Sequence, residues 1–309
     1  MNTEQYAAIT DRLIADLEHG VRPWHRPWNA EHMHGRITRP LRHNGQPYSG
    51  INVILLWCAG TAKGHSTSTW MTFKQAKELG GHVRKGEHGE TVVYADRMIK
   101  TETNGEGEDI ERVIPYLKAY TVFNLDQIDG LPERYLAKVR SEPPEKPLPQ
   151  RIEAAEAFFA ATKAQIRHGG NRAFYAVEPD FIQMPPFEAF QSPEAYYGTL
   201  AHESTHWTKH RSRLDRDFGR LRWGDEGYAK EELVAEIASA YLCSDLGITP
   251  DLENNANYLG SWLTVLKNDK RFIFSAAGFA EKAVGYLHGL QSEASAASEH
   301  SDPDMALAA

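Results

Sequence analysis

Hydrophobic and polar residues follow two different periods in the front part of the chain. A helical stripe runs through positions 4–19 and predicts an amphipathic helix; its apolar members are Tyr6, Ile9, Leu13, Ile14 and Leu17. An unbroken apolar run at positions 51–59 predicts a buried helix. Residues 91–99 and 116–124 alternate instead, which predicts a hairpin across the polar positions 100–112. A small α+β domain is therefore expected here.

A helical period dominates the rear part of the chain. Apolar spacing and end signals predict helices at 152–167, 193–207, 231–242, 257–268 and 272–290. Short apolar segments at 173–177 and 181–184 predict two strands ahead of the second of these helices. The rear domain is therefore expected to be mainly helical.

A proline-rich segment separates the two parts. Four prolines lie among the seven residues 143–149, and they favour an extended, semi-rigid linker. Small, polar and acidic residues occupy positions 291–309 and predict a disordered tail. We therefore divide the chain into a front domain at 1–140, a linker at 141–150, a rear domain at 151–290 and the tail.

Composition excludes several classes of protein. No apolar run reaches about 18 residues, so no membrane-spanning helix is expected. Positions 1–20 carry an amphipathic pattern that differs from a secretory signal. The two cysteines, Cys58 and Cys243, lie in apolar surroundings, so a disulfide framework is unsupported and the cytoplasm is the expected compartment.

Charge is distributed unevenly along the chain. Residues 21–100 carry 12 lysines and arginines against 5 acidic residues, a balance of +7, whereas the whole chain carries −8. The remaining residues therefore carry about −15. A basic front part on an acidic protein indicates that one domain meets a polyanion and the other does not.

Aromatic and basic residues interleave within this basic stretch. The candidates for base stacking are Trp24, Trp28, Tyr48 and Trp70, and those for phosphate contacts are Arg39, Arg42, Lys74, Arg84 and Lys85. Exposed rings stack on bases that are not already paired and stacked, and the sequence holds no helix-turn-helix or Cys/His finger, so single-stranded DNA is the indicated partner. The alternatives are tryptophans that close a core and an ordinary solvated basic face.

A candidate metal site begins at His202. Residues 202–206 form an H-E-x-x-H motif in a predicted helix, with Ser192 as the N-cap and Pro193 at the first helical position. Residues four apart share a helical face, so His202 and His206 can bind one metal ion. Glu203 can then take a proton from a water held by that ion. The alternative is a solvated face with two ordinary histidines among the 14 in the chain.

The third metal ligand is expected on the following helix. Lys209 and Ser212 stand where the extended H-E-x-x-H-x-x-G-x-x-H motif needs glycine and histidine, so that class is excluded. Glu231, Glu232 and Glu236 interrupt an apolar run, where a buried carboxylate needs a partner or a metal. We assign Glu232 as the third ligand and Glu236 as the residue that orients a ligating histidine. This arrangement resembles that of the glutamate zincins. A solvated acidic face is the alternative. The motif predicts zinc, although such ligands also accept manganese.

The chain resembles the ArdC-type antirestriction proteins of conjugative plasmids over nearly its whole length. In the front part the resemblance is carried by RPLR at 39–42, YSGIN at 48–52, WMTFKQA at 70–76, VRKGE at 83–87 and VFNLDQ at 122–127. In the rear part it is carried by HESTHWT at 202–208 and EELVAE at 231–236. The resemblance implies a front domain that binds single-stranded DNA and a zincin-like metallopeptidase domain behind it. It also implies protection of incoming plasmid DNA from host restriction during conjugation.

Three functional hypotheses follow. In the first, a cytoplasmic protein acts with single-stranded plasmid DNA and cleaves a protein or peptide substrate in the recipient cell. In the second, DNA binding alone protects the plasmid, and the metal site is structural or lacks turnover. In the third, a regulatory peptidase cleaves a host repressor and uses DNA only for localisation. Replacement of Glu203 separates the second hypothesis from the others, because only the second predicts that protection survives.

Overall fold

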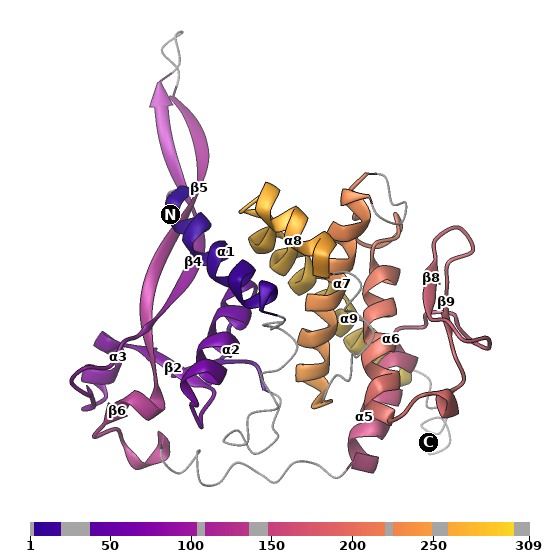
Figure 1. Cartoon of the computed structure of the whole chain (residues 1–309), viewed down its shortest axis with the longest axis horizontal. Helices are drawn as coiled ribbons and strands as arrows, with labels where there is room; N and C mark the ends of the chain where they lie inside the picture. Colours follow the sequence, from indigo (N-terminus) through magenta and orange to yellow (C-terminus); the bar gives the residue numbers. More distant parts are fainter. Residues whose placement is uncertain are drawn as a thin grey trace, which may run out of the picture. The chain divides into compact units, whose positions relative to one another are not determined.

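The computed structural model of the chain describes residues 3–19, 38–103, 109–135, 148–219, 225–248 and 259–299 (Figure 1). The chain divides into two compact units, one formed by residues 1–34 and 40–142 and the other by residues 35–39 and 143–309. Helices and strands occur in both units, which confirms the α+β class. None of the helices in the described part of the chain combines the length and apolar character that crossing a bilayer requires.

The first unit is built on a four-stranded sheet with the strand order β1-β2-β5-β4 (Figure 1). Strand β1 runs parallel to β2, and the other two pairs are antiparallel. The elements of this unit are α1 (Thr3–Glu18), β1 (Leu41–Arg42), α2 (Ile51–Lys63), β2 (Thr69–Thr72), α3 (Phe73–Glu78), β3 (His82–Val83), β4 (Glu90–Thr103), β5 (Asp109–Asn124), η2 (Leu125–Gln127) and β6 (Ile128–Asp129).

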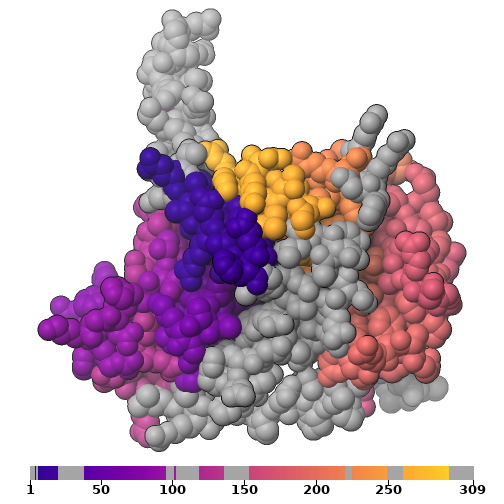
Figure 2. All heavy atoms as spheres, viewed as in Figure 1, coloured from indigo at the N-terminus to yellow at the C-terminus, as the bar shows by residue number. Residues whose placement is uncertain are grey.

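Both helices predicted in the front part of the chain form. Helix α1, drawn in indigo on the surface in Figure 2, buries Leu13, Ile14 and Leu17 of its predicted stripe. Helix α2 buries most of its residues, and Asn52 in its first turn holds it to β4. The Asn52 side chain donates to the carbonyl oxygen of Val93 and accepts from the Val93 amide, each at 2.7 Å. Helix α2 therefore packs against the sheet as a second layer.

The hairpin of β4 and β5 is longer than the sequence predicted. Positions 100–112 were expected to form a polar connection, but β4 continues to Thr103 and β5 begins at Asp109. One uninterrupted antiparallel register joins Glu90↔Val122 to Thr103↔Asp109. The backbone ladder satisfies N–H and C=O groups without requiring an apolar face, so a polar composition did not exclude strand structure.

The second unit combines a small sheet with long helices. Its three strands have the order β7-β9-β8, with β7 parallel and β8 antiparallel to β9. Its elements are α5 (Leu148–Ala161), β7 (Ile166–His168), β8 (Phe174–Ala176), β9 (Phe181–Met184), η3 (Phe187–Ala189), α6 (Pro193–Thr208), α7 (Glu226–Leu246), α8 (Leu259–Asn268) and α9 (Phe272–Glu299).

Three predicted boundaries in the rear part are corrected. Helix α5 begins at Leu148, inside the expected linker, because Pro149 is tolerated in the first turn of a helix. It ends before β7, because residues 166–168 pair with β9 instead of continuing the helix. Helix α9 extends to Glu299, nine residues into the expected tail, because no glycine or proline interrupts positions 291–299.

Helix α7 is the central element of the second unit. It packs against both α6 and α9 (Figure 1), and every residue from Glu231 to Ser244 is buried. A helix buried on all sides is normally apolar all round, yet α7 carries Glu231, Glu232 and Glu236 within this stretch. These carboxylates need partners, and α6 and the loop that follows it provide them.

Candidate metal centre

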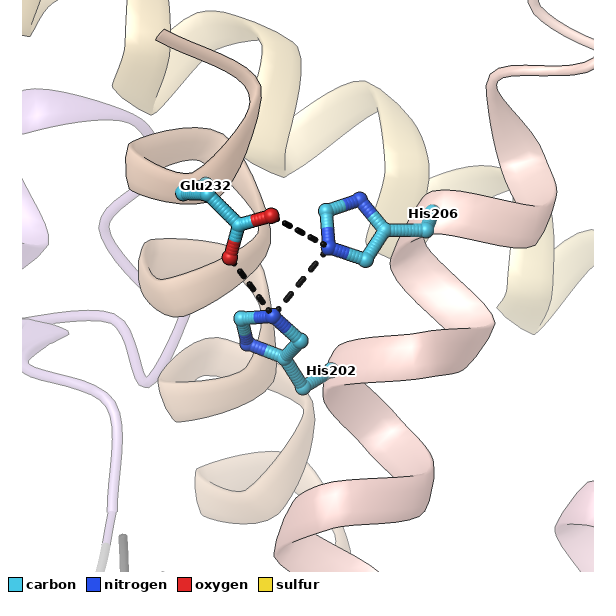
Figure 3. A group of neighbouring side chains, drawn as sticks. All are labelled: His202, His206 and Glu232. Atoms are coloured by element: carbon cyan, nitrogen blue, oxygen red, sulfur yellow. Dashed lines mark hydrogen bonds and ion pairs between the residues drawn. The ribbon is translucent and has the colours of Figure 1, made fainter. Parts of the chain in front are cut away.

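Helix α6 begins as the sequence predicts and directs the motif at α7. The Ser192 hydroxyl accepts a hydrogen bond from the Ala195 amide at 3.1 Å, and Pro193 opens the helix. One turn separates His202 from His206, so both imidazoles point to the same side, toward Glu232 on α7 (Figure 3). Both histidines are buried, with 9% and 7% of their surface exposed.

The side chains of His202, His206 and Glu232 form a triangle of potential ligand atoms (Figure 3). The two Nε2 atoms lie 3.1 Å apart. Glu232 Oε2 lies 3.3 Å from His202 Nε2, and Glu232 Oε1 lies 3.4 Å from His206 Nε2. Two imidazole nitrogens and the two oxygens of one carboxylate, from two helices, therefore face one another.

These distances fit a divalent metal ion. Bonds of about 2.0–2.1 Å at tetrahedral angles separate two donor atoms by about 3.3–3.4 Å. Right angles in an octahedral site with bonds of about 2.2 Å separate them by about 3.1 Å. The observed N–N distance of 3.1 Å and N–O distances of 3.3 and 3.4 Å, the last two made by different oxygens of Glu232, span both values. Two imidazoles and one carboxylate are also the donor set found in catalytic zinc sites. The residues present therefore fit a divalent metal and accommodate either geometry.

Glu231 makes the closest outer contact with a potential ligand. Its Oε1 atom lies 3.0 Å from Nδ1 of His206, which leaves Nε2 of that ring directed at the centre. Both oxygens of Glu231 also accept hydrogen bonds from Arg216, at 2.8 Å each. The predicted orienting residue, Glu236, lies beside the other histidine, with Oε2 3.7 Å from Nδ1 of His202. That distance suits an ion pair and exceeds a hydrogen bond.

This contact of Glu231 was not predictable from the sequence. The adjacent acid was visible in the sequence, but its partner Arg216 lies 15 residues earlier, between the two helices. No local periodicity connects a residue in that loop with α7.

Buried acids dominate the electrostatics of the centre. Besides the two histidines, the buried charged residues that the structure describes at this centre are one base, Arg216, and four acids, Glu203, Glu231, Glu232 and Glu236. Burial alone would lower the pKa of His202 and of His206, but interactions with Glu232 raise both above the ordinary imidazole value. Burial would raise the pKa of Glu231, but Arg216 and His206 lower it to about 2. The centre therefore favours positive charge, as a cation site must.

The structure separates the residues that the sequence proposed for DNA contacts. Arg39 clusters with the second unit and is buried, with hydrogen bonds to Asp245 at 2.7 and 2.9 Å and to Glu281 at 2.9 and 3.0 Å. Trp70 is 2% exposed and packs edge-on against the ring of His65. Contacts with phosphates or bases need solvent-facing atoms. The predicted DNA contacts of Arg39 and Trp70 are therefore wrong, and both side chains are part of the packed interior.

The remaining DNA candidates occupy different positions in the first unit. Arg42 and Tyr48 line one cavity, with the Arg42 guanidinium 5.4 Å from the centre of the Tyr48 ring. Lys74 is 85% exposed and lies 3.7 Å from Glu78. Arg84 is paired with Glu87 and Asp129, and Lys85 is exposed. Trp24 and Trp28 lie outside the described residues.

The fold and the site define the class of protein in the second unit. A family model described as a zincin-like metallopeptidase matches residues 153–279. A second family model, the N-terminal domain of the anti-restriction factor ArdC, matches residues 3–123. The chain belongs to the ArdC family of antirestriction proteins.

Solved structures of a related protein match both units. The metal-free structure of the antirestriction ArdC protein from the R388 plasmid is 47% identical, with a TM-score of 0.78 over 93% of this chain and 98% of that one. Its Mn(II)-bound structure is 46% identical, with a TM-score of 0.75 over 94% of this chain and 99% of that one. The likeness therefore extends over both units.

Two further relatives have sequences similar to this chain. The uncharacterised protein y4eC of Sinorhizobium fredii (strain NBRC 101917 / NGR234) is 37% identical over 301 residues, 94% of each chain. The DNA primase TraC of Escherichia coli is 40% identical over 300 residues, which are 90% of this chain and 26% of TraC. This chain therefore spans about a quarter of TraC. The match does not assign the primase activity of TraC to this chain.

Proposed function

We propose that this antirestriction protein has two activities in the cytoplasm of a recipient cell. Its first unit binds single-stranded DNA, and its second unit hydrolyses a peptide bond in a recipient protein. The observation that carries the enzymatic part is the triangle of His202, His206 and Glu232, with Glu203 next to it in the chain. The DNA-binding part is supported by the +7 balance of residues 21–100 and by the match of the first unit to the ArdC N-terminal domain.

Each residue of the centre has a definite part in this proposal. His202, His206 and Glu232 would hold a divalent ion, which would lower the pKa of a bound water and polarise a carbonyl group. Glu203 accepts the proton of the attacking water and passes it to the leaving amine. Glu231 holds the imidazole of His206 in the tautomer whose Nε2 lone pair faces the centre.

Zinc is the ion that we propose, with manganese as the alternative. A tetrahedral site with nitrogen and oxygen donors suits zinc, whereas the R388 relative has been solved with Mn(II). Elemental analysis of the purified chain, followed by titration of the stripped protein with each ion, distinguishes the two. Zinc at about one equivalent is expected, and manganese at that stoichiometry would contradict the assignment.

The test of the enzymatic proposal is Glu203→Gln in a transfer assay with a restricting recipient strain. Glutamine keeps the size of the side chain but cannot accept the proton, so protection of unmodified plasmid DNA should be lost. Metal content and single-strand affinity should stay at the wild-type level. A matched control is Glu226→Gln, because Glu226 is a 58% exposed acid on α7 that pairs with Lys230.

One observation favours a second candidate function. The site is enclosed, with Glu203, Glu232 and both histidines at most 9% exposed, and an extended peptide needs access to the scissile bond. In this alternative the ion stabilises the second unit, and DNA binding alone protects the plasmid. Full protection by Glu203→Gln would establish it, and a cleaved recipient protein found only with wild-type chain would exclude it.

A further inference from the structure

A cavity in the first unit has the features of a nucleobase site. It measures about 330 Å³, near the lower end of the roughly 300–1,000 Å³ typical of small-ligand sites. Its walls come from the turn after β1, from the starts of α2 and α3, and from β4 and β5. The lining residues are Arg42, His43, Asn44, Tyr48, Asn52, Thr72, Gln75, Val92, Val93, Tyr94, Tyr120 and Val122. A space of this size suits one base and excludes a duplex.

Two tyrosines at this cavity are unusually exposed. Tyr94 and Tyr120 have 50% and 44% of their surface open to solvent. Val92 pairs with Tyr120, and Tyr94 pairs with Lys118, so the two tyrosines are diagonal neighbours on one face of the hairpin. Large exposed rings grouped at a cavity mark a binding surface, and tyrosine stacks on any base regardless of sequence.

The charge of the cavity suits a nucleic acid strand. Its lining contains no aspartate or glutamate among the described residues, although acids outnumber bases in the chain as a whole. Of the arginines proposed for phosphate contacts, Arg39 and Arg84 are paired with carboxylates. Arg42 has no carboxylate partner in the described part of the chain and lies at the cavity. Helix α2 begins here too, and its first amide groups favour an anion.

Backbone hydrogen bonds hold the polar rim in place. The Arg42 amide donates to the carbonyl oxygen of Gln46, and the Gly45 amide donates to that of Arg42, both at 2.8 Å. Gly45 has a φ of 85°, which a residue without Cβ adopts readily. The turn that carries Arg42, His43 and Asn44 is therefore set before any ligand arrives.

Resting on the proposed DNA-binding function, we infer that this cavity receives one base of single-stranded DNA, stacked on Tyr94 and Tyr120, while Arg42 contacts a neighbouring phosphate. The site selects single strands, because a base in a duplex is unavailable to the rings. It has little sequence preference, because stacking uses the faces that all bases share.

The experiment measures affinity for a fluorescent thymidine oligonucleotide by anisotropy, using the full chain. Tyr94→Ala with Tyr120→Ala should weaken binding by about 5- to 100-fold, the loss typical of base stacking. Tyr94→Phe with Tyr120→Phe should restore wild-type affinity, because the rings remain. Arg42→Met should reduce the slope of log affinity against log salt by about 0.7, the value of one phosphate contact on a single strand.

The matched control is Phe73→Ala. Phe73 is another exposed ring of the first unit, 56% exposed, and it does not line the cavity. Its removal should leave affinity unchanged, and an equal loss would overturn the cavity as the site. Unchanged affinity in the double alanine variant would also overturn it, while leaving DNA binding by the first unit standing.

Two further measurements show which ligand the cavity binds. Failure of the wild-type chain to bind single strands at all would overturn both the cavity and the proposed function. Equally tight binding of free thymidine monophosphate would reassign the cavity to mononucleotides. Competition by single strands but not by duplex or by the mononucleotide is the expected result.

Discussion

Replacement of Glu231 by glutamine tests how the second unit holds its metal ligands. Glu231 is 2% exposed and accepts two hydrogen bonds of 2.8 Å from Arg216, which is itself buried. The same carboxylate lies 3.0 Å from His206 Nδ1. Glutamine preserves the volume and one carbonyl oxygen but removes the charge, so the two consequences can be treated separately.

The first consequence concerns the free energy of unfolding. Removal of one partner from a buried ion pair costs about 3–5 kcal/mol, because the other charge stays buried without compensation. The remaining amide oxygen still accepts one bond from Arg216, so we expect the lower end, about 3 kcal/mol. The second consequence concerns metal affinity, because loss of an orienting carboxylate weakens metal binding about 10- to 100-fold, or about 1.4–2.7 kcal/mol.

Stability is measured by urea unfolding in the presence of a chelator, and affinity by competition with a chromophoric chelator. Glu226→Gln on the same helix is the control, and its stability should change by less than about 0.5 kcal/mol because Glu226, the acid of an ion pair with Lys230, is 58% exposed. Wild-type metal affinity in Glu231→Gln would refute the role of this carboxylate in orienting His206. A stability loss below about 1 kcal/mol would refute the buried-pair reasoning.

Two other predictions concern residues outside the centre. Arg39→Met should lower the free energy of unfolding by about 2–3 kcal/mol, because Asp245 and Glu281, which are 20% and 35% exposed, lose their cation. Urea unfolding measures this loss, and the affinity for single-stranded DNA should not change. Weaker DNA binding at unchanged stability would show that Arg39 contacts DNA after all. Burial raises the pKa of the Cys243 thiol, which is 0% exposed, so little of it is present as the reactive thiolate at pH 8. Cys243 should not react with iodoacetamide until the chain is denatured, and rapid labelling of this residue in the folded chain, read by mass spectrometry, would contradict its burial.

Much of the centre could be read from local sequence. The H-E-x-x-H spacing, the Ser192 cap and Pro193 are properties of one helix, because helical periodicity and capping act over a few residues. Glu232 could be chosen because a carboxylate within an apolar helix demands a partner. The structure places that carboxylate 3.3 and 3.4 Å from the two histidines.

Partners that lie far apart in the chain could not be read in the same way. Arg39 and Arg42 both belong to the RPLR stretch, yet Arg39 is neutralised by Asp245, 206 residues later, while Arg42 lines a cavity. Tyr94 and Tyr120 carry the same alternating signal as any strand residue, and only the hairpin register brings them to one face.

Local sequence therefore accounts for the elements that depend on near neighbours: the motif helix, its cap and the acids that follow it. Only the packed fold shows which charges are exposed and which are paired, and which partners Glu231 and Glu236 each have. The physical reason is that burial and ion pairing depend on which distant segments pack together. A residue's neighbours in the chain do not specify that environment.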